Sequence, residues 1–148
     1  MSALDLRAVL ADASHSGAYF VADSDAEAVA AAGAALDYEV VRIDLAGCSD
    51  NAEVFARFAE ALRFPDWFGH NWDALADSLG DLSWLPAVGY LLLIEHADAW
   101  RAAAGADADT LLEVLNDAAF GWAEQEIAFW ALFPLPAAQL DALDGPSS

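Results

Sequence analysis

The run of six residues from Gly89 to Ile94, GYLLLI, constrains the fold more than any other part of the sequence. Its apolar side chains follow one another without alternating with polar ones. A strand of this kind needs cover on both faces, which is the situation of a central strand in a largely parallel sheet. The sequence therefore predicts an α/β fold in which helices pack on a parallel sheet.

The segments on either side of this run have the spacing of further strands and helices in alternation. Short apolar runs predict strands at Ala18–Val21, Tyr38–Leu45 and Ile127–Phe133, the last one stopped by Pro134 and Pro136. Helical spacing and capping-box patterns at Ser24/Glu27 and Asp50/Glu53 predict helices at Leu4–Ala13, Ser24–Leu36, Asp50–Pro65, Asn71–Asp81 and Asp109–Ala119. We expect one domain with about four strands.

The charge of the chain limits its partners. Five arginines, no lysine and 25 acidic residues among 148 give a formal net charge of −20 at pH 7. Such a field repels nucleic acid and anionic membranes, and it attracts cations and basic proteins. We therefore expect a basic protein as partner, and no nucleic acid or membrane. A different interpretation is that the charge only keeps the protein soluble or reflects a salt-adapted host.

The single cysteine, Cys48, excludes an internal disulfide framework and suits a reducing cytosol. It lies in a turn-like stretch without a basic neighbour in sequence, so we expect no activated thiolate. Charged residues interrupt the N-terminal apolar pattern, and the apolar run Ile127–Leu135 is too short to span a bilayer. We expect a soluble, cytoplasmic protein.

The segment Phe64–Asp81 carries the clearest functional pattern. At helical spacing Trp72, Leu75 and Leu79 form an apolar stripe for the core, while Asp73, Asp77 and Asp81 recur every fourth residue on the outward side. Like charges at this spacing cost about 0.2–0.5 kcal/mol per pair. No lysine or arginine lies between Arg63 and Arg101 to neutralise the row. The carboxylates are therefore suited to a partner that brings the positive charge.

Other interpretations of this segment stay open at this point. The row is also compatible with an ordinary solvated helix face. Paired carboxylates can do acid–base chemistry, but two Asp on an exposed helix lack an apolar pocket that would separate their pKa values. His70, Asp73 and Asp77 have a spacing that could hold a divalent metal, although no second cluster supports it.

The residues just before this helix predict a tight turn in which Gly69 permits a positive φ. Trp67 and Phe68 cannot both point inward easily there. We expect at least one of them to be an exposed interface anchor, the alternative being that both pack over the sheet edge.

The run FPDWFGHNWDALADSL resembles the signature of the barstar family, intracellular inhibitors of secreted barnase-type ribonucleases. The positions that carry the resemblance are Pro65, Trp67, Phe68, Gly69, Asn71, Asp73, Ala74, Leu75 and Asp77. The flanking elements agree in order, from about Tyr38 to Phe133. The resemblance implies a three-stranded parallel core over residues 38–133. Residues 1–37 would then be a helix–strand–helix extension that adds a fourth parallel strand, and residues 134–148 a tail.

The resemblance also implies a mode of binding without catalysis, cofactor or metal. Family members place carboxylates in the nuclease active site where the RNA phosphate would bind. By position, Trp67, Asp73 and Asp77 would make these contacts. Gly69, Asn71 and Ala74 would shape the contact loop and helix, and Asp117 would supply a further carboxylate from another helix.

The chain departs from the family pattern at several positions. Phe68 cannot donate the hydrogen bond of a tyrosine, His70 and Ala76 stand at positions that can be acidic and aromatic, and the loop Leu82–Val88 is longer. We expect an immunity-type ribonuclease inhibitor rather than an enzyme. The alternative is a regulatory module of the same fold that binds another basic protein, and the N-terminal extension could direct it to a different ligand.

Overall fold

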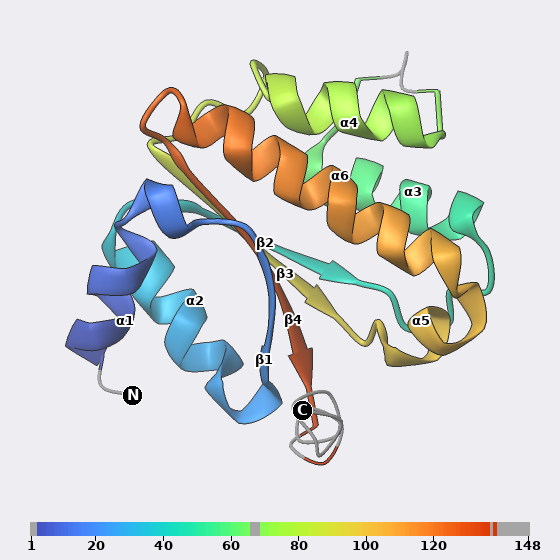
Figure 1. Ribbon diagram of the computed structural model, residues 1–148, viewed down its shortest axis with the longest axis horizontal. Coiled ribbons are helices and arrows are strands. Elements are labelled where there is room, and N and C mark those ends of the chain that lie inside the picture. Colours follow the sequence, from blue (N-terminus) through green and yellow to red (C-terminus); the bar gives the residue numbers. More distant parts are fainter. Residues whose placement is uncertain (1–2, 66–68, 137, 139–148) are drawn as a thin grey trace.

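A four-stranded, entirely parallel sheet forms the centre of the computed structural model, which describes residues 3–65, 69–136 and 138 (Figure 1). The strands are β1 (Ala18–Ala22), β2 (Glu39–Asp44), β3 (Gly89–Glu95) and β4 (Ala128–Leu135), in the spatial order β1-β4-β3-β2. The residues of β3 from Gly89 to Ile94 are buried, which confirms the prediction of a central strand. The predicted fourth strand, β1, pairs in parallel with β4.

Helices cover the two faces of the sheet. The helices α1 (Ala3–Leu10) and α2 (Ala26–Ala35) pack on one face, over Leu91 and Leu93 of β3. The other face, with Leu92 and Ile94, lies under the helices α3 (Asn51–Leu62), α4 (Trp72–Asp81), α5 (Asp98–Ala104) and α6 (Ala106–Ala123). Two short 3-10 turns, η1 (Ala13–His15) and η2 (Asp23–Asp25), flank β1. The alternation of side chains along β3 thus feeds two separate apolar cores.

The N-terminal unit is attached to the sheet through one carbonyl group as well as through strand pairing. The oxygen of Leu10 accepts hydrogen bonds from Trp130 Nε1 at 2.9 Å and from the Tyr38 hydroxyl at 2.8 Å. Trp130 belongs to β4, and Tyr38 immediately precedes β2. These two donors therefore join the end of α1 to the two strands that lie on either side of β3.

Three predictions about elements were wrong. The capping box predicted at Ser24 and Glu27 is not formed, because Ser24 lies in the η2 turn. The N-cap of α2 is Asp25, which makes no side-chain capping bond. Glu27 instead forms an ion pair with Arg42 at 2.7 Å. Of the two prolines predicted to stop the last strand, Pro134 does not, and β4 ends at Leu135, directly before Pro136. β4 pairs with β3 only as far as Leu132. At Pro134 its only neighbouring strand is β1, so the missing N–H of this proline interrupts no pairing with β3.

The third concerns the stretch between β3 and position 109, where the sequence predicted no helix, whereas the structure has α5 and an α6 that begins at Ala106. The segment of α5, DAWRAAA, is only seven residues long, too short for a helical period to show, and its buried Trp100 fixes it to the core. By contrast, Asp50 caps α3 as predicted, with its carboxylate accepting from Glu53 N–H at 2.9 Å.

Two further observations bear on the sequence predictions. Cys48 is a buried free cysteine, and burial raises the pKa of its thiol, in keeping with an inert side chain. In the part of the chain that the structure describes, no helix has the length and apolar character needed to cross a membrane.

Candidate functional site

The start of α4 is fixed by the side chain of Asn71. Its Oδ1 accepts the Ala74 N–H at 2.8 Å, while its Nδ2 donates to the Gly69 carbonyl at 3.2 Å. A Cβ on Gly69 would lie 3.1 Å from that Nδ2, closer than ordinary contact, so glycine permits the close approach. The positive φ next to it belongs to His70, at 51°. Gly69, Asn71 and Ala74 therefore set the direction in which α4 leaves the loop.

The buried side of α4 is the stripe that its spacing predicted. Leu75 and Leu79 are fully buried, and the Trp72 ring packs edge-on against Phe55 with centroids 4.9 Å apart. The indole N–H of Trp122, on α6, donates to the Leu79 carbonyl at 2.8 Å. These contacts hold α4 on the core and tie it to α6.

The outward side of α4 carries the predicted carboxylates. Asp73, Asp77 and Asp81 are all exposed, and no cation among the described residues forms an ion pair with them. The first of them lies in the first turn, where the helix dipole favours a negative charge. The other two have no such compensation, so the row is kept at a cost in local stability.

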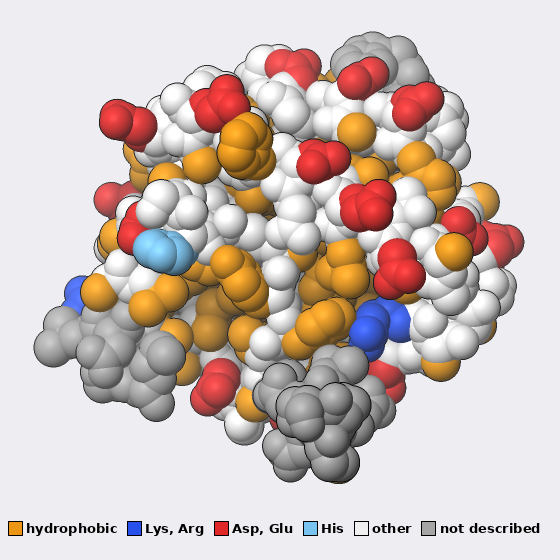
Figure 2. Space-filling view, viewed as in Figure 1, with side chains coloured by type: hydrophobic (Ala, Val, Ile, Leu, Met, Phe, Trp, Pro, Cys, Tyr) orange, Lys and Arg blue, Asp and Glu red, His pale blue; other side chains and the backbone are white. Residues whose placement is uncertain are grey.

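Asp117 is brought to the same region by α6. It is exposed and lines a small hollow of about 190 Å³ between the two helices. Ala76 and Gly80 of α4 line the opposite wall of this hollow, with Gly121 and Trp122 on the α6 side. Asp73, Asp77 and Asp117, which we call the acidic surface, thus come from two helices that meet at the hollow. Figure 2 shows carboxylate side chains gathered over α4 and α6.

One exposed residue of this region was not predicted. Phe120 has 70% of its surface exposed, the largest fraction among the exposed large hydrophobic side chains of the described residues. It follows Asp117 by three positions on α6, so the two side chains lie on neighbouring parts of one helix face. The only signal for this exposure in the sequence is the spacing of three residues between Phe120 and Asp117. An exposed aromatic beside carboxylates is a common interface anchor.

Two predicted site residues, Trp67 and Phe68, lie outside the described residues, so their exposure stays a prediction. Within residues 3–65, 69–136 and 138, no group of three or more His, Cys, Asp or Glu side chains is placed to hold a metal ion. The geometry therefore gives no support to a metal site at His70, Asp73 and Asp77.

Comparison with known proteins assigns most of the chain. The family model for barstar, described as the barnase inhibitor, matches residues 38–134. A comparison with curated protein sequences finds no match. The matched range includes α3 to α6 and the strands β2 to β4, with the acidic surface inside it, and it leaves α1, β1 and α2 outside. The chain therefore belongs to the barstar family, whose members are inhibitors rather than enzymes, and it carries additional residues before the family domain.

Proposed function

We propose that this protein is a stoichiometric inhibitor of a basic, barnase-type ribonuclease, and that it blocks the nuclease with the acidic surface. The observation that carries the proposal is the placement of Asp73, Asp77 and Asp117: all are exposed, none is paired with a described cation, and they lie on two helices fixed to each other. Because the backbone of both helices is fixed, binding would restrict only the side chains of these carboxylates.

The chemistry of the partner follows from what these groups can accept. A ribonuclease that binds the RNA backbone needs Arg, Lys or protonated His side chains in its active site. Carboxylates of the acidic surface would accept charge-assisted hydrogen bonds from the same groups, in the place of phosphate oxygens. The net charge of −20 would also speed the encounter with a basic nuclease at low salt.

The test is a titration of barnase, the nuclease named by the matched family, with the purified protein while hydrolysis of an RNA substrate is followed. We expect activity to fall linearly to zero at a one-to-one ratio. The double substitution Asp73→Ala/Asp77→Ala should abolish this effect. Equal inhibition by the double variant would show that the acidic surface is not the inhibitory site.

A second titration would use a basic nuclease secreted by the source organism. Failure of both nucleases to bind, with recovery of a different basic protein on the immobilised chain, would favour the alternative of a regulatory module. In that case the carboxylates of the acidic surface should still be needed for capture.

A further inference from the structure

An apolar groove lies on the opposite face of the sheet from the acidic surface and has a volume of about 620 Å³. Its walls come from α1, α2, β1 and β4, and it is lined by Leu6, Ala8, Val9, Leu10, Asp12, His15, Tyr19, Val21, Val29, Trp130 and Leu132. We call it the N-terminal groove, because nine of these eleven residues precede the domain matched by the family model. Figure 2 shows a hollow with apolar side chains beside β1.

The groove exists because α1 and α2 do not cover all of the sheet. β1 is an edge strand, and none of its five residues is fully buried. The side chains of Tyr19 and Val21, two positions apart on β1, both line the groove. The Tyr19 ring lies next to that of Trp130 on β4, with ring centroids 5.6 Å apart. Val9 and Tyr19 are 45% and 46% exposed. Apolar surface left open in a concave site of 300–1,000 Å³ is typical of small-molecule sites.

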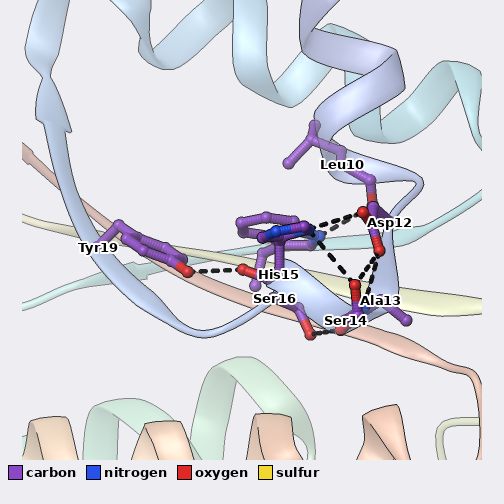
Figure 3. A network of polar contacts seen from close by, with 8 residues as sticks. Leu10, Asp12, Ala13, Ser14, His15, Ser16 and Tyr19 are labelled. Carbon is purple, nitrogen blue, oxygen red and sulfur yellow. Dashed lines mark hydrogen bonds and ion pairs between the residues drawn. The ribbon is translucent and has the colours of Figure 1, made fainter.

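One end of the groove is polar. Asp12 Oδ1 accepts the Ser14 N–H at 3.0 Å and the Ser14 hydroxyl, and its Oδ2 lies 2.7 Å from Nδ1 of His15. The Tyr19 hydroxyl donates to the His15 carbonyl at 2.6 Å (Figure 3). The carboxylate thus faces Nδ1 of His15, and the Asp12, Ser14, His15 and Tyr19 polar groups gather at this end of the groove. No bond of Nε2 to another described residue is present.

We propose that the N-terminal groove binds a small organic amine with an apolar body. The body would lie on the apolar floor, and the ammonium group would lie at the polar end of the groove, near the Asp12 carboxylate. The Tyr19 ring offers its π-face to a cation, and the net charge of −20 concentrates cations at the surface. The same carboxylate and the same negative field would repel an anionic head group. This proposal does not depend on nuclease inhibition.

The first experiment compares three ligands with the same eight-carbon body: octylamine, 1-octanol and octanoate. Isothermal titration calorimetry with the full chain should show saturable one-to-one binding of octylamine. 1-Octanol should bind about tenfold more weakly than octylamine, and octanoate more weakly than 1-octanol. Failure of octylamine to bind, or binding of octanoate at least as tight, would overturn the proposal.

The second experiment locates the site. Val9→Lys places a cation at the mouth of the groove, and Val88→Lys is its matched control, since Val88 is 64% exposed and is not a lining residue. Octylamine should bind about tenfold more weakly to Val9→Lys and unchanged to Val88→Lys. Asp12→Asn should reduce the preference for octylamine over 1-octanol. Equal binding to both lysine variants would place the ligand elsewhere and refute the proposal.

A second copy of the chain is the competing occupant of the groove. Sedimentation equilibrium of the wild type should show a monomer. A dimer that Val9→Lys dissociates and Val88→Lys does not would identify the groove as an interface between copies, and the amine proposal would be wrong.

Discussion

The acidic surface and the N-terminal groove are built in opposite ways on the two faces of one sheet. In the acidic surface, buried leucines and a Trp122 hydrogen bond fix two helices so that carboxylates point outward. In the groove, apolar side chains stay partly open and polar groups gather at one end. The first arrangement suits a large, charged partner, and the second suits a small ligand with one polar group.

The two regions also differ in their relation to the barstar family. The acidic surface lies inside residues 38–134, the range of the barstar family model, whereas most of the groove comes from residues before it.

Removing a carboxylate from the acidic surface should have the largest effect. We expect Asp77→Ala to weaken the complex with the nuclease by about 2–5 kcal/mol, because it leaves a cation of the partner buried without its acceptor. Asp23→Ala, an exposed carboxylate of η2, is the control and should leave affinity unchanged. Affinities would be measured by competition binding. An equal loss of binding free energy in both variants would contradict the prediction, because it would mean that only the net charge matters.

The exposed aromatic of α6 should come next. Phe120→Ala should weaken the nuclease complex by about 1–2 kcal/mol, because a 70% exposed ring beside the carboxylates can be desolvated only by a partner. The free energy of unfolding should stay within about 0.5 kcal/mol of wild type. Val88→Ala, at an exposed position outside the acidic surface, should change neither quantity. An unchanged affinity for Phe120→Ala would limit the interface to the acidic surface.

The attachment of the N-terminal unit can be loosened without touching the acidic surface. Tyr38→Phe removes one of the two donors to the Leu10 carbonyl and should cost about 1 kcal/mol. Native-state hydrogen exchange should show faster exchange of α1 amides and unchanged protection in α4. Equal acceleration in both helices would mean that the two regions unfold as a single unit.

A substitution under the acidic surface should stabilise the protein slightly. Ser78 is fully buried in α4, and its hydroxyl has no hydrogen-bond partner among the described residues. Ser78→Ala removes this unsatisfied group and favours the helix, so we expect a gain of up to about 1 kcal/mol in urea unfolding. Ser83→Ala, at an exposed position, should have no effect. A loss of stability in Ser78→Ala would indicate that the hydroxyl is satisfied in solution.

The smallest effect concerns a pair that belongs to neither region. Asp44, at the end of β2, lies 2.8 Å from Nδ1 of His96, and this contact raises the pKa of His96. The hydrogen bond from Ala46 N–H, followed by the one with His96, lowers the pKa of Asp44. The His96 contribution to stability is present below its unfolded pKa of 6.5 and lost as pH rises through the raised folded value.

Both side chains are more than half exposed, so we expect this contribution to be at most about 0.5 kcal/mol. Urea unfolding of wild type and His96→Gln should differ at about pH 5.5 and converge at about pH 8. A difference that grew with pH would contradict the assigned direction.

The sequence predicted the elements whose signal is local. The unbroken apolar run of β3 specified a central strand, and the apolar stripe of α4 specified which of its sides is buried. It failed where a neighbour from elsewhere in the chain decides the outcome. Glu27 leaves its expected cap because Arg42 of β2 is close, and Pro134 stays in β4 because its only strand neighbour there is β1.

The sequence by itself therefore determined the α/β fold, the family and the exposed carboxylates Asp73 and Asp77, because each follows from spacing within one segment. Only the tertiary structure decided that Asp117 comes to lie beside α4, through a contact such as that between Leu79 and Trp122, and that Phe120 stays exposed on α6. It also decided that α1 and α2 leave a groove over β1. Such features depend on how distant segments pack, and the pattern of one segment does not contain that information.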